Sequence, residues 1–135
     1  MNCKNIIKNF FHMNLNIKLY HWQTKLYSRH KASDELHSNI LELIDTFIEV
    51  YIGKYNRPEF SHNFDINVGT QTGCSDKNEE TICQEDDIVK LIKEYINYLT
   101  NDLPKQLNSN DTDLLNIRDE MLAVFNQTLY LFTLV

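Results

Sequence analysis

The chain has 135 residues and a formal net charge of −6, and no apolar stretch in it approaches the roughly 20 residues needed to span a bilayer. The acidic balance argues against tight nonspecific DNA binding, which needs lysines and arginines to displace phosphate counterions. We therefore expect a soluble, intracellular, cytoplasmic protein that does not bind membranes. DNA binding should be weak or absent, with Lys25, Arg29 and Lys31 as the one local basic patch.

The cysteines Cys3, Cys74 and Cys83 are odd in number and lack paired zinc spacing, which favours free thiols in a reducing compartment. Lys4 and Lys8 interrupt the first apolar residues, so no signal peptide is expected. The abundance of Asn, Ile and Lys is compatible with an AT-rich coding sequence, and a virus-encoded origin is one source of such sequences.

Two helices are predicted in the first half of the chain, over about residues 2–26 and 28–55, with a short connection between them. Apolar side chains recur at helical spacing in both. The first face holds Ile6, Phe10, Met13, Ile17, Tyr20 and Thr24, and the second holds Leu36, Ile40, Leu43, Ile44, Phe47 and Tyr51. Gly53, Asn56 and Pro58 then provide helix stop signals.

Residues 56–80 are polar and irregular, which is long for a connection in a compact domain. The candidate anchors of this connection are Phe60, Phe64, Ile66 and Val68. The segment 81–84 has the form of a capping box that opens a third helix over about 82–102. A fourth helix is predicted over about 111–133, opening near Asn110 or Asp111.

Four helices with one wide apolar face each, and no strand alternation of any length, predict an all-α fold. We expect a single domain over residues 1–135, built as a four-helix bundle. The long connection between the second and third helices suits a crossover.

Five side chains between residues 21 and 49 are candidate metal ligands: His21, His30, Asp34, Asp45 and Glu49. Residues four apart share one face of a helix, so His30 pairs with Asp34 and Asp45 pairs with Glu49. Eleven residues of helix separate the two pairs by roughly 16 Å, whereas metal–ligand bonds measure about 2.0–2.2 Å. If both pairs bind one ion, they must come from two copies of the chain.

Each candidate also has an ordinary explanation. An acidic pair four residues apart is usually solvated surface, His21 near a helix end is more often a packing or capping residue, and His30 can form a simple hydrogen-bonded pair with Asp34. The joint placement near the core edge, with His37 alongside, favours a cation that offsets the cost of like charges, about 0.2–0.5 kcal/mol per pair. Imidazole with several carboxylates suits iron, zinc or manganese rather than copper(I), which prefers sulfur.

The ligand spacing resembles the ferroxidase signature of Dps miniferritins, which are ferritin-like four-helix bundles that assemble into dodecameric cages. The matching residues are His21–Trp22, then His30 with Asp34, then Asp45 with Glu49. The resemblance implies that the histidines and Asp34 of one subunit bind iron(II) together with Asp45 and Glu49 of its two-fold partner. Hydrogen peroxide or oxygen would oxidise the iron before mineral storage, and Trp22 would serve as an electron donor that protects against radicals.

The close resemblance covers residues 21–49, and the rest of the chain matches only in helix count. The segment from His21 to His30 is three residues shorter than in that family, and its basic N-terminal tail is absent. The family's short helix between the second and third helices falls where this chain has the polar 56–80 segment. Ordinary ferritins use two Glu-x-x-His motifs, one on each of two helices, whereas this sequence contains a single one, Glu59 with His62, in the polar 56–80 segment.

Two functions follow from these observations. The first is an iron-oxidising and iron-sequestering homo-oligomer, in which acidic side chains on an inner surface nucleate ferric product. Candidates for that surface are Glu85, Asp86, Asp87, Asp111 and Asp113. The second is a non-catalytic helical oligomer or virion-type structural protein, in which the metal only pins a two-fold interface.

Overall fold

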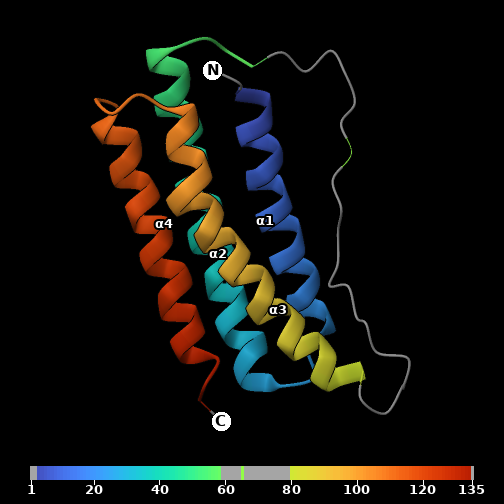
Figure 1. The fold of residues 1–135 in the computed structure, drawn as a ribbon. Helices are drawn as coiled ribbons and strands as arrows, with labels where there is room; N and C mark the ends of the chain where they lie inside the picture. Colours follow the sequence, from blue (N-terminus) through green and yellow to red (C-terminus); the bar gives the residue numbers. More distant parts are fainter. Residues whose placement is uncertain (1–2, 59–64, 66–79, 135) are drawn as a thin grey trace.

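The computed structural model describes residues 3–58, 65 and 80–134. This part of the chain is helical and contains no strand (Figure 1). The elements are α1 (Cys3–Gln23), α2 (Tyr27–Lys54), α3 (Glu80–Asn97), η1 (Tyr98–Asp102), η2 (Leu103–Gln106) and α4 (Thr112–Leu131). The prediction of an all-α fold with four long helices is therefore confirmed for the described residues, with small differences at the helix ends.

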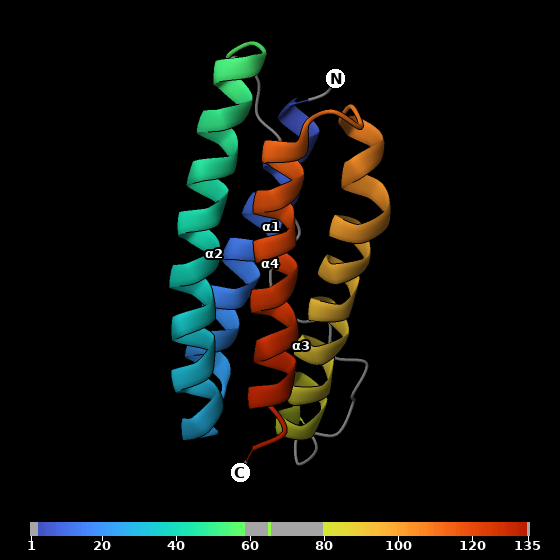
Figure 2. The same ribbon diagram turned by 90° about the vertical axis from the view of Figure 1, so that its left-hand side faces the viewer.

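The helices form a bundle in which α1 and α4 run in one direction and α2 and α3 run in the other (Figures 1 and 2). Helix α1 contacts α2 and α3, and α4 contacts the same two helices. Residues 24–26 join α1 to α2, as the short predicted connection requires. Residues 55–79 join α2 to α3, and the candidate anchors Phe60, Phe64, Ile66 and Val68 lie outside the described residues.

The predicted apolar faces meet in one core. Its centre includes Phe10 of α1 and Phe47 of α2, whose rings meet edge to face with centroids 5.1 Å apart. Such an edge-to-face contact stabilises a fold by about 0.5–1.5 kcal/mol beyond the contribution from burying the apolar area of the rings. Two members of the predicted faces are less buried than expected: Leu43 is half-buried and packs against the core from its edge, and Thr24 follows the end of α1.

The start of α4 agrees with the sequence, whereas the start of α3 differs. Asp111 immediately precedes α4 and is 2 % exposed. Its carboxylate contacts Lys54 Nζ at 2.7 Å, and this ammonium group holds the pKa of Asp111 below its usual value. Helix α3 begins at Glu80, so Thr81 is a first-turn residue and not the residue before the helix.

Helix α3 ends in a single wider turn. The Leu103 N–H donates to the Tyr98 carbonyl, five residues back, which defines the π-helical η1. Tyr95, Leu99 and Leu103 recur every four residues and are all buried. In a regular α-helix that spacing rotates by about 40° per step, so the wider turn keeps the three side chains on the core. Arg118 Nη1 donates to the Leu99 carbonyl at 3.0 Å.

A buried ion pair joins the four helices at one end of the bundle. Arg29 Nη1 lies 3.0 Å from Glu85 Oε2 and also donates to the Glu85 carbonyl at 2.9 Å. Arg29 Nη2 donates to the Phe132 carbonyl at 3.2 Å, while Tyr20 and Thr24 donate to the Glu85 carboxylate. Burial and the bond to Glu85 raise the pKa of Tyr20 to about 12. We call this group the Arg29–Glu85 cluster.

Two sequence-based assignments are therefore wrong. Arg29 does not contribute to an exposed basic patch, because its side chain is only 16 % exposed and is paired with Glu85. Glu85 and Asp111 are not available as surface acids for mineral nucleation, since both are buried and bound to cationic side chains. None of the described helices has the length and apolar character needed to cross a bilayer.

Candidate metal centre

Two histidines face each other across the turn between α1 and α2. His21 lies in the last turn of α1 and is 7 % exposed, and His30 lies in the first turns of α2. Their rings are stacked, with centroids 3.9 Å apart and planes inclined by 18°. The short segment between α1 and α2 therefore brings the two predicted ligands into direct contact.

The two histidines are held by a reciprocal pair of backbone hydrogen bonds. His21 Nδ1 lies 2.8 Å from the His30 carbonyl, and His30 Nδ1 lies 3.0 Å from the His21 carbonyl. A carbonyl oxygen only accepts, so each Nδ1 must carry the proton. In the neutral form of each ring, Nε2 then keeps its lone pair, as in a metal-binding histidine whose second nitrogen is anchored by a hydrogen bond. Buried Ser33 supports this arrangement through its Oγ, 3.2 Å from His21 Nδ1.

Asp34 lies beside this histidine pair. Its Oδ1 is 3.9 Å from His21 Nε2, less than twice the roughly 2.1 Å length of a metal–ligand bond, so one ion can contact both atoms. Lys18 Nζ lies 3.8 Å from the same oxygen and 5.6 Å from the centroid of the Trp22 ring. Trp22 itself is 67 % exposed. The nitrogen and oxygen donors suit iron or zinc.

His37 belongs to the same electrostatic environment. Burial lowers its pKa, the positive charge of Lys18 lowers it further, and Asp34 opposes that effect. His21 also lowers the pKa of His37. His37 is therefore neutral at neutral pH, and its ring lies near the cluster that the sequence indicated.

Asp45 and Glu49 lie further along α2, which is uninterrupted from Tyr27 to Lys54. Both are exposed, and the continuous helix keeps them roughly 16 Å from His30 and Asp34. Among the described residues, no group of three or more His, Cys, Asp or Glu side chains is placed to hold one ion. The structure places His21 against His30 and beside Asp34, without a geometry in which all three could hold one ion, and it leaves the second acidic pair apart.

An apolar hollow of about 230 Å³ lies between α1 and α2 beside Asp45. It is lined by Ile7, Phe10, Phe11, Leu41, Ile44 and Ile48. Phe11 is 41 % exposed, Leu41 is 47 % exposed, and Leu15 on the same helix as Phe11 is 46 % exposed. The outer side of the α1–α2 pair therefore carries apolar side chains together with the candidate acids.

A family described as a family of unknown function (DUF5856) matches residues 21–132. The chain belongs to this family. The matched range begins at His21 and includes all five candidate ligands of this DUF5856 chain. Neither a curated protein nor a solved structure matches the sequence.

Sequence reasoning missed two parts of this DUF5856 site. Ser33 lies within hydrogen-bonding distance of His21 Nδ1 and bonds to the His30 carbonyl at 3.2 Å, and Lys18 lies beside Asp34. Lys18 precedes His21 by three residues, which places both on one side of α1. That spacing was the available signal for Lys18, whereas no local pattern indicates the part played by Ser33.

Proposed function

We propose that the chain is a Dps-like, ferritin-like protein that binds iron(II) at a site shared by two subunits and oxidises it for storage. The observation that carries this proposal is the reciprocal bonding of His21 and His30, which leaves the Nε2 atom of each neutral ring available for ligation, with Asp34 Oδ1 3.9 Å from His21 Nε2. Asp45 and Glu49 of a second copy would complete the donor set. Zinc is the alternative ion.

The helix directions support a ferritin-like arrangement. Helices α2 and α3 run in parallel and are joined by a connection that spans residues 55–79 (Figure 1). Ferritin-like bundles have one such long crossover, whereas simple up-and-down bundles have none.

A two-fold axis at α2 would bring the two ligand pairs together. The midpoint between His30–Asp34 and Asp45–Glu49 falls between residues 39 and 40. An antiparallel crossing of two α2 helices at that point sets each pair opposite the other pair of the partner. Leu41, near this midpoint, is 47 % exposed, and Phe11 and Leu15 would also be covered by such a contact. Assembly of these dimers into a dodecameric cage is part of the proposal.

The reaction is the oxidation of iron(II) as substrate. Two iron(II) ions each give one electron to hydrogen peroxide, which takes up two protons and becomes two water molecules; oxygen is the alternative oxidant. The protein holds the ions through imidazole nitrogens and carboxylate oxygens. Trp22, exposed beside Lys18, is placed to give an electron to a radical formed nearby.

The first test is iron(II) oxidation by the Asp45→Ala/Glu49→Ala variant. We expect the wild-type protein, loaded without oxygen and then given peroxide, to form ferric iron faster than a protein-free solution. The variant should fall to the protein-free rate, because it lacks half of the donor set. Initial rates of ferric absorbance give the comparison. The matched control, Asp119→Ala/Glu120→Ala, removes the same charge from exposed positions on α4 and should keep the wild-type rate.

The second candidate function is a non-catalytic oligomer in which the metal only pins the interface. The observation behind it is Lys18 Nζ at 3.8 Å from Asp34 Oδ1, because an ammonium group that competes with the metal for this carboxylate weighs against a catalytic iron site. In that case chelation should dissociate the oligomer, as followed by light scattering after size exclusion. Under the leading proposal the apolar contact persists after chelation, and only the oxidation stops.

A further inference from the structure

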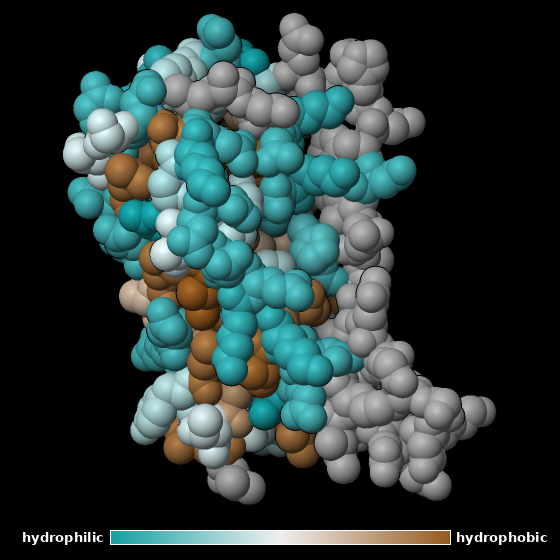
Figure 3. Space-filling model, in the orientation of Figure 1, coloured by the Kyte–Doolittle hydropathy of each residue, from teal (hydrophilic) through white to brown (hydrophobic). Residues whose placement is uncertain are grey.

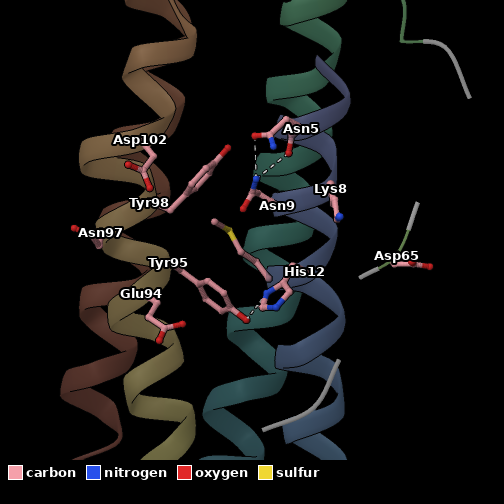
Figure 4. A pocket seen from close by; sticks show the side chains of 11 residues that line it. Asn5, Lys8, Asn9, His12, Asp65, Glu94, Tyr95, Asn97, Tyr98 and Asp102 are labelled. Atoms are coloured by element: carbon pink, nitrogen blue, oxygen red, sulfur yellow. Dashed lines mark hydrogen bonds between the residues drawn. The ribbon is translucent and has the colours of Figure 1, made fainter. Parts of the chain in front are cut away.

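A second, polar cavity lies on the opposite side of α1, where this helix faces α3 and η1. Its volume is about 510 Å³, within the 300–1,000 Å³ that small-molecule sites occupy. Figure 4 shows side chains from α1 on one side and from α3 and η1 on the other. In the orientation of Figure 1, where α3 lies in front, hydrophilic side chains cover much of the face toward the viewer (Figure 3).

The Tyr98 hydroxyl at this cavity has no hydrogen-bond partner among the described residues. The Tyr98 side chain is 9 % exposed, and it extends from η1 across the cavity toward α1 (Figure 4). A buried hydroxyl without a partner is costly, and such groups in native proteins call for a water molecule or a ligand. Tyr98 also begins the π-helical turn, a distortion that is frequent at functional sites.

The charges at this cavity favour a cation. Glu94 and Asp102, four residues before and after Tyr98, line the α3 and η1 side. Lys8, which is the one lysine among the described lining residues, points away from these acids on the far side of α1 (Figure 4). Burial lowers the pKa of His12, which lies 3.1 Å from the Tyr95 hydroxyl, so this ring is neutral at neutral pH.

Glu94 and Asp102 also shift the pKa values of side chains beside them. Besides burial, the negative charge of Asp102 raises the pKa of Tyr98, and that of Glu94 raises the pKa of Tyr95 and opposes the lowering at His12. Both phenols are therefore neutral and can accept a hydrogen bond from an ammonium group. Aromatic faces also attract cations.

We propose that the cavity between α1 and the α3–η1 segment binds a small organic cation of the alkylammonium class, such as a linear diamine or polyamine. The Tyr98 hydroxyl accepts a hydrogen bond from an ammonium group, and Glu94 and Asp102 neutralise the charges of the ligand. This site lies away from the His21–His30 pair and does not depend on the iron proposal.

The experiment is calorimetric titration of the full-length protein with spermidine, at low and at physiological salt. We expect saturable binding that weakens about tenfold in Asp102→Asn and in Glu94→Gln, since each loses one charge-assisted contact. Tyr98→Phe should weaken binding several-fold while the melting temperature of the free protein stays the same or rises, because the buried hydroxyl has no partner to lose. Glu120→Gln, an exposed acid of α4, is the matched control and should bind as the wild type does.

Three results would overturn the proposal. One is an absence of saturable binding, and another is equal weakening by Glu120→Gln and Asp102→Asn, which would mean nonspecific attraction to an acidic protein. The third is displacement of spermidine by magnesium at similar concentration, which would make the cavity a metal-ion site. Loss of affinity in Tyr98→Phe without loss of stability would support a ligand contact, because removal of a hydroxyl with a structural role would lower stability and leave binding unchanged.

Discussion

Mixing two inactive variants should restore iron oxidation. His30→Ala/Asp34→Ala and Asp45→Ala/Glu49→Ala each damage both copies of a shared site. Random pairing of equal amounts makes half of the dimers mixed, and each mixed dimer has one intact site of two. The expected rate is therefore about a quarter of the wild-type rate, from the symmetry of a two-fold contact. Co-expression with two different affinity tags and measurement of the initial ferric absorbance test this.

Sequential purification on the two tags gives the control, because it verifies that mixed oligomers are present. Inactivity of verified mixed oligomers would contradict a shared site. Activity in either variant alone would show that its substituted residues are dispensable. A mixture of His30→Ala with Asp34→Ala should stay inactive, since both residues belong to the same half of the site.

Glu85→Gln should destabilise the fold more than any exposed substitution. The change removes the charge that pairs with Arg29, whose side chain is 16 % exposed. Breaking one partner of a buried ion pair costs about 3–5 kcal/mol, because the remaining charge stays buried without compensation. Urea unfolding, followed by circular dichroism, should show a lower midpoint at an unchanged slope.

Asp86→Asn is the matched control for this measurement. Asp86 is the next residue on α3 and is exposed, so its free energy of unfolding should change by less than about 0.5 kcal/mol. Equal midpoints for the two variants would mean that the Arg29–Glu85 cluster makes no special contribution to stability.

The helices and most core residues were predictable because local spacing encodes them. Ile6, Phe10, Met13 and Ile17 recur at helical intervals, and all are buried in the structure. The Arg29–Glu85 cluster was not predictable, because its partners are separated by 56 residues in sequence. Only the assembled bundle brings the starts of α2 and α3 together at one end, and the charges of Arg29 and Glu85 alone suggested surface positions.

The candidate metal centre was predictable to a similar extent. Spacing placed His30 and Asp34 on one face and separated them from Asp45 and Glu49, and continuous α2 agrees with that separation. The hydrogen bonds between the histidines depend on the path of residues 24–26, which sequence periodicity does not specify. Joint binding of one ion by His30 and Asp34 of one subunit and Asp45 and Glu49 of another remains a prediction for the oligomer.

The wider turn at Tyr98–Asp102 also has an evolutionary consequence. A π turn holds one residue more than the α turn it replaces, and it converts to a regular turn by a single-codon deletion. Because the deletion removes only the extra residue, the chain beyond the turn would keep nearly the same register, and the residue matching Leu103 would still face the core. Relatives with the shorter form should therefore keep the apolar pattern after the turn while lacking one residue of the 98–102 segment.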